Sequence, residues 1–114
     1  MSLILFFLSC SDKGLAVYNQ APTISISSHA DGDNVVSGTS TTFQAVVGDL
    51  NHNTEDLLVR WLTSEAEICP NEAPDTSGMS VCVYTPSNDD EWVRAQVIDP
   101  AGALAEDQVD LNIA

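Results

Sequence analysis

An alternation of apolar and polar residues constrains the fold of this chain more than any other feature. From Ala21 onward, short segments place apolar residues at every second position, and clusters of Gly, Pro, Asn and Asp separate these segments about every ten residues. A period of two is typical of β-strands, whose side chains point alternately to the two faces of a sheet. Apolar residues nowhere recur at helical spacing over more than two turns, so we predict no helix.

The alternating segments predict about seven strands, a number typical of a sandwich in which two antiparallel sheets bury their inner faces on each other. The stretch from Glu65 to Gly78 lacks the alternation and is expected to be irregular. The apolar positions that mark the strands are Ile24 and Ile26; Val35 and Val36; Phe43, Ala45 and Val47; Leu57, Val59 and Trp61; Val81 and Val83; Val93, Ala95 and Val97; and Val109, Leu111 and Ile113.

The charge of the chain excludes one class of partner. It carries 17 acidic and 3 basic residues, which give a formal net charge of -14. A nucleic-acid backbone or an anionic bilayer surface would repel such a protein, so we expect no nucleic-acid partner. With 44% hydrophobic and only 18% charged residues, the chain nevertheless has the composition of a folded domain.

The first ten residues form an apolar run that ends in a small residue and a cysteine. This run is less than half of the roughly 20 residues that a membrane-spanning helix needs. It has the outline of a secretory signal, and Leu8-Ser9-Cys10 resembles the lipobox of bacterial lipoproteins. The resemblance implies a signal segment in residues 1–10, a lipid on Cys10, a tether in residues 11–21 and a folded domain in residues 22–114. The alternative is an apolar start with a buried or free cysteine.

An odd cysteine count requires an explanation in an exported protein. Of the three cysteines, a lipidated Cys10 would leave Cys69 and Cys82 as a pair around a turn-rich loop. A disulfide that closes this loop would contribute about 3 kcal/mol to stability. Two other states remain open: two buried reduced thiols, or half of a zinc site, although no further Cys or His lies at ligand spacing.

The segment from Asp49 to Asp56 is a candidate Ca²⁺ site, because oxygen-bearing side chains occupy its alternate positions. Ca²⁺ needs six to eight converging oxygens. A sandwich that places the loop after the last-but-one strand at the same end would bring a further aspartate close. The alternative is a solvated acidic loop whose side chains complete local turns. The candidate ligands are Asp49, Asn51, Glu55, Asp56 and Asp99.

A second candidate site is aromatic. Trp92 is predicted to lie on the outer face of its strand beside Arg94, where it and Tyr84 could form a platform for a sugar or a protein partner. The alternative is that the two rings cover a sheet edge. His29 and His52 are expected to be exposed loop residues at opposite ends of the sandwich. No nucleophile and base stand in a recognisable catalytic motif, so we predict no enzymatic activity.

Several short motifs follow one another along the chain. They are Ala21-Pro22-Thr23-Ile24-Ser25-Ile26-Ser27-Ser28, Asp31-Gly32, Gly38-Thr39, Phe43-Gln44-Ala45, Glu55-Asp56-Leu57 and Val97-Ile98-Asp99-Pro100-Ala101-Gly102. In this order they resemble the bacterial Ig-like and PKD-like extracellular domains, over residues 21–114. The resemblance implies a sandwich with Trp61 as the large buried aromatic of the third strand. It also implies a spacing, adhesive or ligand-presenting role.

Together, these features predict an all-β, Ig-like, two-sheet antiparallel sandwich. We expect a non-enzymatic, exported module of a bacterial lipoprotein that acts as a spacer or as an interaction or adhesion domain. Its lipid on Cys10 would anchor it in the envelope membrane, at the outer membrane or cell surface. The alternative is a Ca²⁺-binding or carbohydrate-binding module of a larger surface protein, with neighbouring domains as partners. No cofactor is required, and Ca²⁺ is the one candidate ion.

Overall fold

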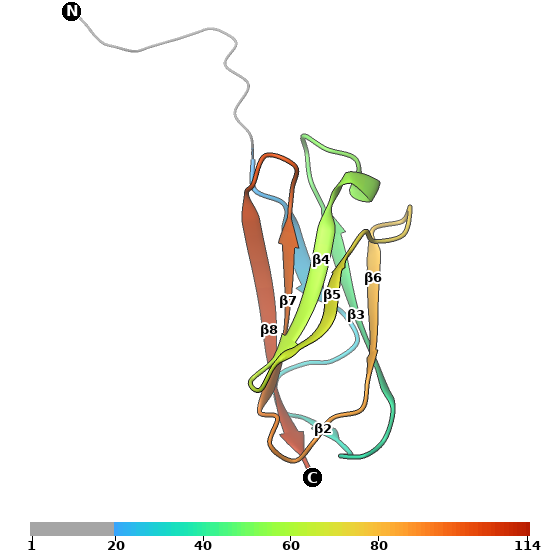
Figure 1. The fold of residues 1–114 in the computed structure, drawn as a ribbon, viewed down its shortest axis with the longest axis vertical. Helices are drawn as coiled ribbons and strands as arrows, with labels where there is room; N and C mark the ends of the chain where they lie inside the picture. Colours follow the sequence, from blue (N-terminus) through green and yellow to red (C-terminus); the bar gives the residue numbers. More distant parts are fainter. Residues whose placement is uncertain (1–19) are drawn as a thin grey trace, which may run out of the picture.

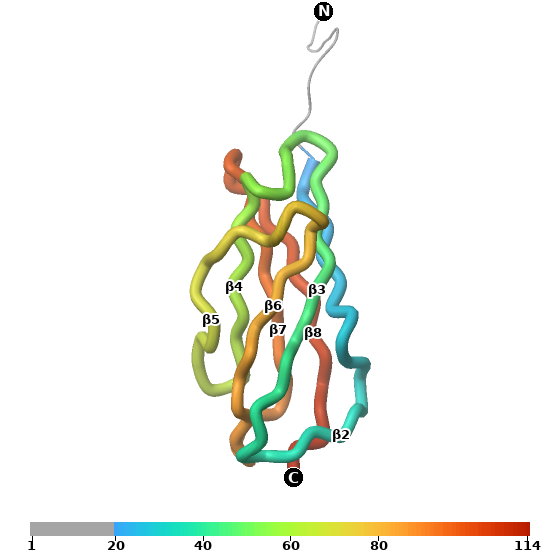
Figure 2. Tube along the Cα trace, turned by 90° about the vertical axis from the view of Figure 1, so that its right-hand side faces the viewer, coloured from blue at the N-terminus to red at the C-terminus, as the bar shows by residue number. Residues whose placement is uncertain are grey.

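Two β-sheets packed face to face form the protein in a computed structural model that describes residues 20–114 (Figures 1 and 2). Cys10, the predicted signal segment and most of the predicted tether lie outside the described residues. One sheet has the strand order β1-β3-β6 and the other β2-β8-β7-β4-β5. The strands are β1 (Thr23–Ile26), β2 (Asp33–Val35), β3 (Thr41–Gly48), β4 (Leu58–Thr63), β5 (Glu67–Glu72), β6 (Met79–Tyr84), β7 (Trp92–Ile98) and β8 (Leu104–Ile113).

The predicted all-β sandwich is confirmed, and its strand order is compatible with an Ig-like sandwich. All pairings but one are antiparallel; the short strand β2 runs parallel to the end of β8. Among the described residues the only helix is the single 3-10 turn η1 (Thr54–Asp56), and no helix there is long and apolar enough to cross a membrane.

The described chain has eight strands, because β5 lies inside the stretch from Glu65 to Gly78 that was expected to be irregular. This strand is at the edge of its sheet, and its register against β4 shifts on both sides of Trp61. Pro70 stands in its middle, and most of its side chains are exposed. An edge strand with no fully buried face needs no apolar alternation, so the sequence pattern could not predict it.

Strand β6 presents the opposite face to the core from the one that its apolar residues suggested. Val81 and Val83 are 49% and 61% exposed, whereas Ser80 and Cys82 are buried. Cys82 faces inward because it bonds to Cys69, and Ser80 faces inward because it accepts a hydrogen bond from a buried tryptophan. Two specific contacts therefore override the hydrophobic pattern of this strand.

The core lies between the two sheets, and Trp61 and Phe43 are its largest fully buried side chains. Trp61 is 1% exposed, and its ring lies 6.3 Å, between centroids, from the ring of the fully buried Phe43 of the opposite sheet. The resemblance to Ig-like domains implied this position. The buried apolar residues are Ile26, Val35, Phe43, Ala45, Val47, Leu57, Val59, Trp61, Cys82, Val93, Ala95, Val97, Val109 and Leu111.

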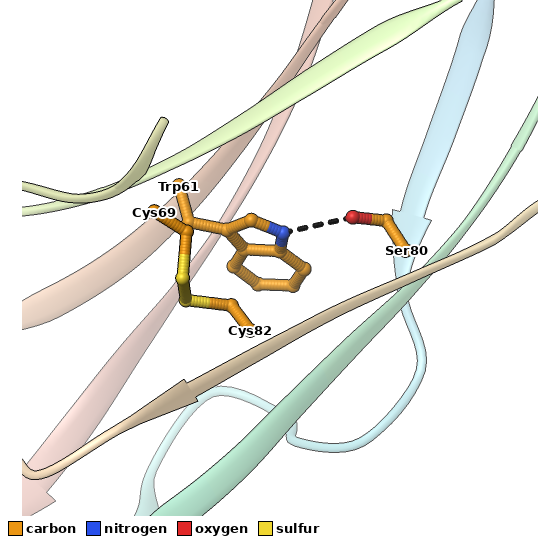
Figure 3. The surroundings of a disulfide bond; sticks show 4 residues. All are labelled: Trp61, Cys69, Ser80 and Cys82. Carbon is orange, nitrogen blue, oxygen red and sulfur yellow. Dashed lines mark hydrogen bonds between the residues drawn. A yellow bond between two sulfur atoms is a disulfide. The ribbon is translucent and has the colours of Figure 1, made fainter. Parts of the chain in front are cut away.

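The predicted disulfide between Cys69 and Cys82 is confirmed, with an S–S distance of 2.05 Å. Cys69 belongs to β5 and Cys82 to β6, which are edge strands of different sheets, so the bond crosses from one layer to the other. Figure 3 shows Trp61 beside this bond, where its Nε1–H donates a hydrogen bond of 3.0 Å to the Ser80 hydroxyl. The disulfide and the indole thus connect the two sheets at one side of the sandwich.

The described chain enters and leaves the sandwich at opposite ends (Figure 1). We call the entry end, which carries the β3–β4 loop and the β7–β8 turn, the loop pole. The backbone N–H of Gln20 donates a hydrogen bond of 2.7 Å to the side-chain oxygen of Asn51 in that loop. The β3–β4 loop therefore holds the point where the chain enters the domain.

Removal of the disulfide should destabilise the protein only under oxidising conditions. The bond joins two cysteines that are 13 positions apart in the sequence. The double variant Cys69→Ala/Cys82→Ala should therefore lose about 3 kcal/mol of unfolding free energy. Urea titration monitored by tryptophan fluorescence measures this loss. In a reducing agent, the wild type and the variant should unfold at the same urea concentration. A wild-type curve that reduction leaves unchanged would contradict the bridge.

Candidate functional site

The two loops that carry the predicted metal ligands meet at the loop pole, at the top of Figures 1 and 2. Asp49 is the first residue after β3, and Asp99 is the first residue after β7. Each aspartate also shapes its own turn, because Asp49 Oδ1 accepts a hydrogen bond from the Asn51 N–H (2.8 Å) and Asp99 Oδ1 accepts one from the Ala103 N–H (2.9 Å). These turns hold both carboxylates in place.

Asp49, His52 and Asp99 form a mixed group of carboxylate and imidazole side chains. One ligand atom from each of them lies within 4.8 Å of the others. His52 Nδ1 is 3.3 Å from Asp49 Oδ2 and 3.9 Å from Asp99 Oδ2. Neither aspartate side chain has exposed surface, whereas the imidazole is 23% exposed. Two buried carboxylates beside one imidazole are ligand types that a divalent cation can bind.

The structure brings together Asp49 and Asp99, as the sequence analysis expected, but the other three predicted ligands do not belong to their group with His52. Asn51, Glu55 and Asp56 are exposed, and the side-chain oxygen of Asn51 already accepts the hydrogen bond from Gln20. Glu55 and Asp56 lie on the 3-10 turn η1. The alternate oxygen-bearing positions of the segment from Asp49 to Asp56 therefore do not predict which side chains come together in the folded protein.

Sequence reasoning missed His52 as a member of this group. It was expected to be an exposed loop residue, and in the structure it is half-buried between the two aspartates. The signal that could have found it is its position three residues after Asp49, combined with the expectation that Asp99 lies at the same end of the sandwich. A search for oxygen donors alone passed over the nitrogen donor.

Tyr84 and Trp92 do not form a common surface. Trp92 lies on the outer face of β7, as predicted, and the guanidinium carbon of Arg94 is 4.4 Å from its ring centroid. This cation–π contact occupies one face of the ring. Tyr84 shares the inward-facing side of β6 with Ser80 and Cys82 and packs against the core. The pair therefore gives no aromatic platform, and Trp92 alone remains as an outer aromatic contact.

Tyr84 instead forms a partly buried hydrogen bond with Asp90. Its hydroxyl donates to Asp90 Oδ2 at 2.7 Å, and the Ser87 backbone N–H donates to the same oxygen at 2.9 Å. Burial, the hydrogen bond and the negative charge of Asp90 raise the pKa of Tyr84 to about 12. Burial opposes ionisation of Asp90, but the hydrogen bonds from Ser87 and Tyr84 outweigh it and lower the pKa of this carboxyl. The pair fixes the β6–β7 loop to the end of β6.

Tyr84→Phe should lower the free energy of unfolding by about 1.5 to 3 kcal/mol, because it removes a hydrogen bond to a charged group. The raised pKa of Tyr84 means that this contribution is lost as the pH rises through about 12. The lowered pKa of Asp90 means that it is lost as the pH falls below the usual carboxyl value of 3.8. Urea titrations should therefore give a constant difference from wild type between about pH 5 and pH 9.

For Asp90→Asn, the difference in unfolding free energy from wild type should likewise shrink as the pH falls below 3.8. Asp89→Asn, at an exposed neighbouring position, serves as the matched control and should change little. A difference between Tyr84→Phe and wild type that keeps growing towards low pH would contradict the assignment.

Two comparisons of this sequence with known proteins yield no match. A scan against protein-family models returns no matching family, and a search of the curated proteins finds no significant match. The strand order, the bond between the sheets and the side-chain group at the loop pole are therefore the observations from which a function is argued.

Proposed function

We propose that this chain is an exported, non-enzymatic β-sandwich module of a bacterial lipoprotein, acting as a spacer or interaction domain at the cell envelope. The observation that carries the proposal is the disulfide between Cys69 and Cys82. Disulfides persist in oxidising compartments outside the cytoplasm and are rare in the reducing cytosol. The lipobox-like Leu8-Ser9-Cys10 motif supports the same location. The resemblance of the sequence to bacterial Ig-like and PKD-like extracellular domains is a further part of this proposal, because it implies a spacing or adhesive role.

The path of the chain supports the spacer role. Because the described chain enters at the loop pole and leaves at the opposite end, the sandwich would add its full length between whatever precedes and whatever follows it. The acidic composition suits the same role, since a net charge of -14 keeps the module soluble and away from an anionic bilayer. A lipid on Cys10 would then supply the membrane attachment that the protein surface cannot.

Lipidation can be tested by labelling cells with radioactive palmitate and then fractionating them. The full-length wild type should carry the label and sediment with membranes, whereas Cys10→Ser should carry none and appear in the soluble fraction. Ser11→Ala is the matched control and should behave as wild type. Thiol trapping in the same cells should find Cys69 and Cys82 oxidised. An unlabelled wild type, or free thiols at both later positions, would contradict the proposed location.

A second candidate function is the binding of a divalent cation, which the Asp49, His52 and Asp99 group favours. Carboxylate oxygens are ligands for Ca²⁺, the ion that the sequence suggested, whereas an imidazole nitrogen suits Zn²⁺ and similar metals. A cation there would neutralise the two buried carboxylates. It would also stiffen the loop that binds the backbone of Gln20, where the chain enters the domain.

Thermal melting with Ca²⁺ or Zn²⁺ tests this candidate, since a bound cation stabilises the folded state by RT ln(1 + [L]/Kd). The wild-type melting temperature should rise with millimolar Ca²⁺ or micromolar Zn²⁺. Asp99→Asn should lose this response, and the exposed-site control Asp89→Asn should keep it. Each variant is compared with itself in a chelator, so that a change in basal stability does not obscure the result. Melting temperatures that neither ion moves would rule out the cation function.

A further inference from the structure

The four edges of the two sheets are not equally protected against pairing with another strand. An edge strand exposes a row of unpaired backbone N–H and C=O groups, which proteins protect by short length, charges, Pro or bulges. Strand β2 has only three residues. Strand β5 carries Pro70, Glu67 and Glu72 and pairs irregularly. On the short β1, the Asp107 carboxylate accepts a hydrogen bond of 2.8 Å from the Ile26 N–H. Three of the edges are thus blocked.

Strand β6 has none of these protections. Its six residues, Met79–Tyr84, include no Pro and no charge, and they pair with β3 in one unbroken register. The Met79 carbonyl accepts a hydrogen bond from the Asp75 N–H, on the side away from β3. By the alternation of an antiparallel ladder, the backbone groups of Val81 and Val83 also point away from β3. The edge therefore offers two consecutive sets of strand-pairing groups.

The surface around this edge is apolar on the sheet and acidic beside it. Val81 and Val83 are 49% and 61% exposed, and Val46 of the neighbouring β3 is 46% exposed. A cleft of about 220 Å³ lies between β5 and β6, and Glu72 and Asp75 are among its lining residues. Glu72 is exposed, so a basic side chain can reach it.

We propose that the edge of β6 is a docking site for an extended, basic segment of a partner polypeptide, which adds a fourth strand to the β1-β3-β6 sheet. This inference rests on the proposed role as an interaction domain and names its surface. A row of backbone donors and acceptors selects a strand, and the alternate valines give its side chains an apolar contact.

The charge decides between the two occupants that a free edge can take. A second copy of this chain would bring together two molecules with a net charge of -14 each, whereas a basic segment is attracted to the surface and to the cleft. The edge is also held rigid before any partner arrives. Cys82 is bonded to β5, and Ser80 accepts the indole hydrogen bond of Trp61 (Figure 3). Little conformational entropy would then be lost on binding.

The test uses the oxidised protein and a synthetic peptide of about seven residues that alternates lysine with valine. Binding is measured by fluorescence anisotropy, and protection of backbone amides by NMR hydrogen exchange. The wild type should bind the peptide, with new protection at the amides of Val81 and Val83. Val81→Pro removes an outward-facing N–H without removing a bond to β3, so it should fold and bind at least about tenfold more weakly.

Val83→Lys provides a second variant, and Val36→Lys, at an exposed valine that follows β2, is its matched charge control. Val83→Lys should lose at least about tenfold more affinity than Val36→Lys. Equal binding by these two variants, or protection confined to other strands, would overturn the inference. A wild-type dimer in sedimentation that Val81→Pro abolishes would overturn the choice of a basic partner. Palmitate labelling without peptide binding contradicts this inference alone, and peptide binding without labelling contradicts the export proposal alone.

Discussion

The contact of Trp61 with the opposite sheet is the interaction on which the rest of this structure depends. Its ring fills the space between the layers, its N–H is satisfied by Ser80, and the Cys69–Cys82 bond lies beside it (Figure 3). A buried indole without a partner for its N–H would cost free energy, so Ser80 must face inward. This requirement sets the orientation of β6. It turns Val81 and Val83 outward and so creates the exposed edge.

The disulfide connects the fold with the proposed location. It joins β5 and β6, the edge strands of the two sheets on the same side of the sandwich. The sandwich is closed there by a covalent bond of a kind that is rare in the reducing cytosol. The proposed activities use separate parts of one sandwich domain. The length of the sandwich between its two ends would set the distance between the segments before and after it. The Asp49, His52 and Asp99 group would respond to cations, and β6 would recruit a partner strand.

Most of the fold could be predicted from the sequence because strands with one buried face must alternate. Strands β3, β4 and β7 follow this rule, and their predicted inward residues are buried. β5 could not be predicted, since an edge strand without a buried face has no alternation to detect. The face of β6 was predicted wrongly because a disulfide and a hydrogen bond, not hydrophobicity, orient it. At the loop pole, topology predicted that Asp49 and Asp99 would meet. The contribution of His52 depends on the path of one loop, which no periodic pattern encodes.

The most direct measurement is the free energy of unfolding of Trp61→Ala, with the disulfide intact, against Trp92→Ala as the matched control. Trp61 is 1% exposed, and Trp92 lies on the outer face of its sheet. The account predicts a loss of about 3 to 5 kcal/mol for Trp61→Ala and a clearly smaller loss for Trp92→Ala. A loss below about 1 kcal/mol at Trp61, or a larger loss at Trp92, would contradict the claim that this indole holds the two sheets together.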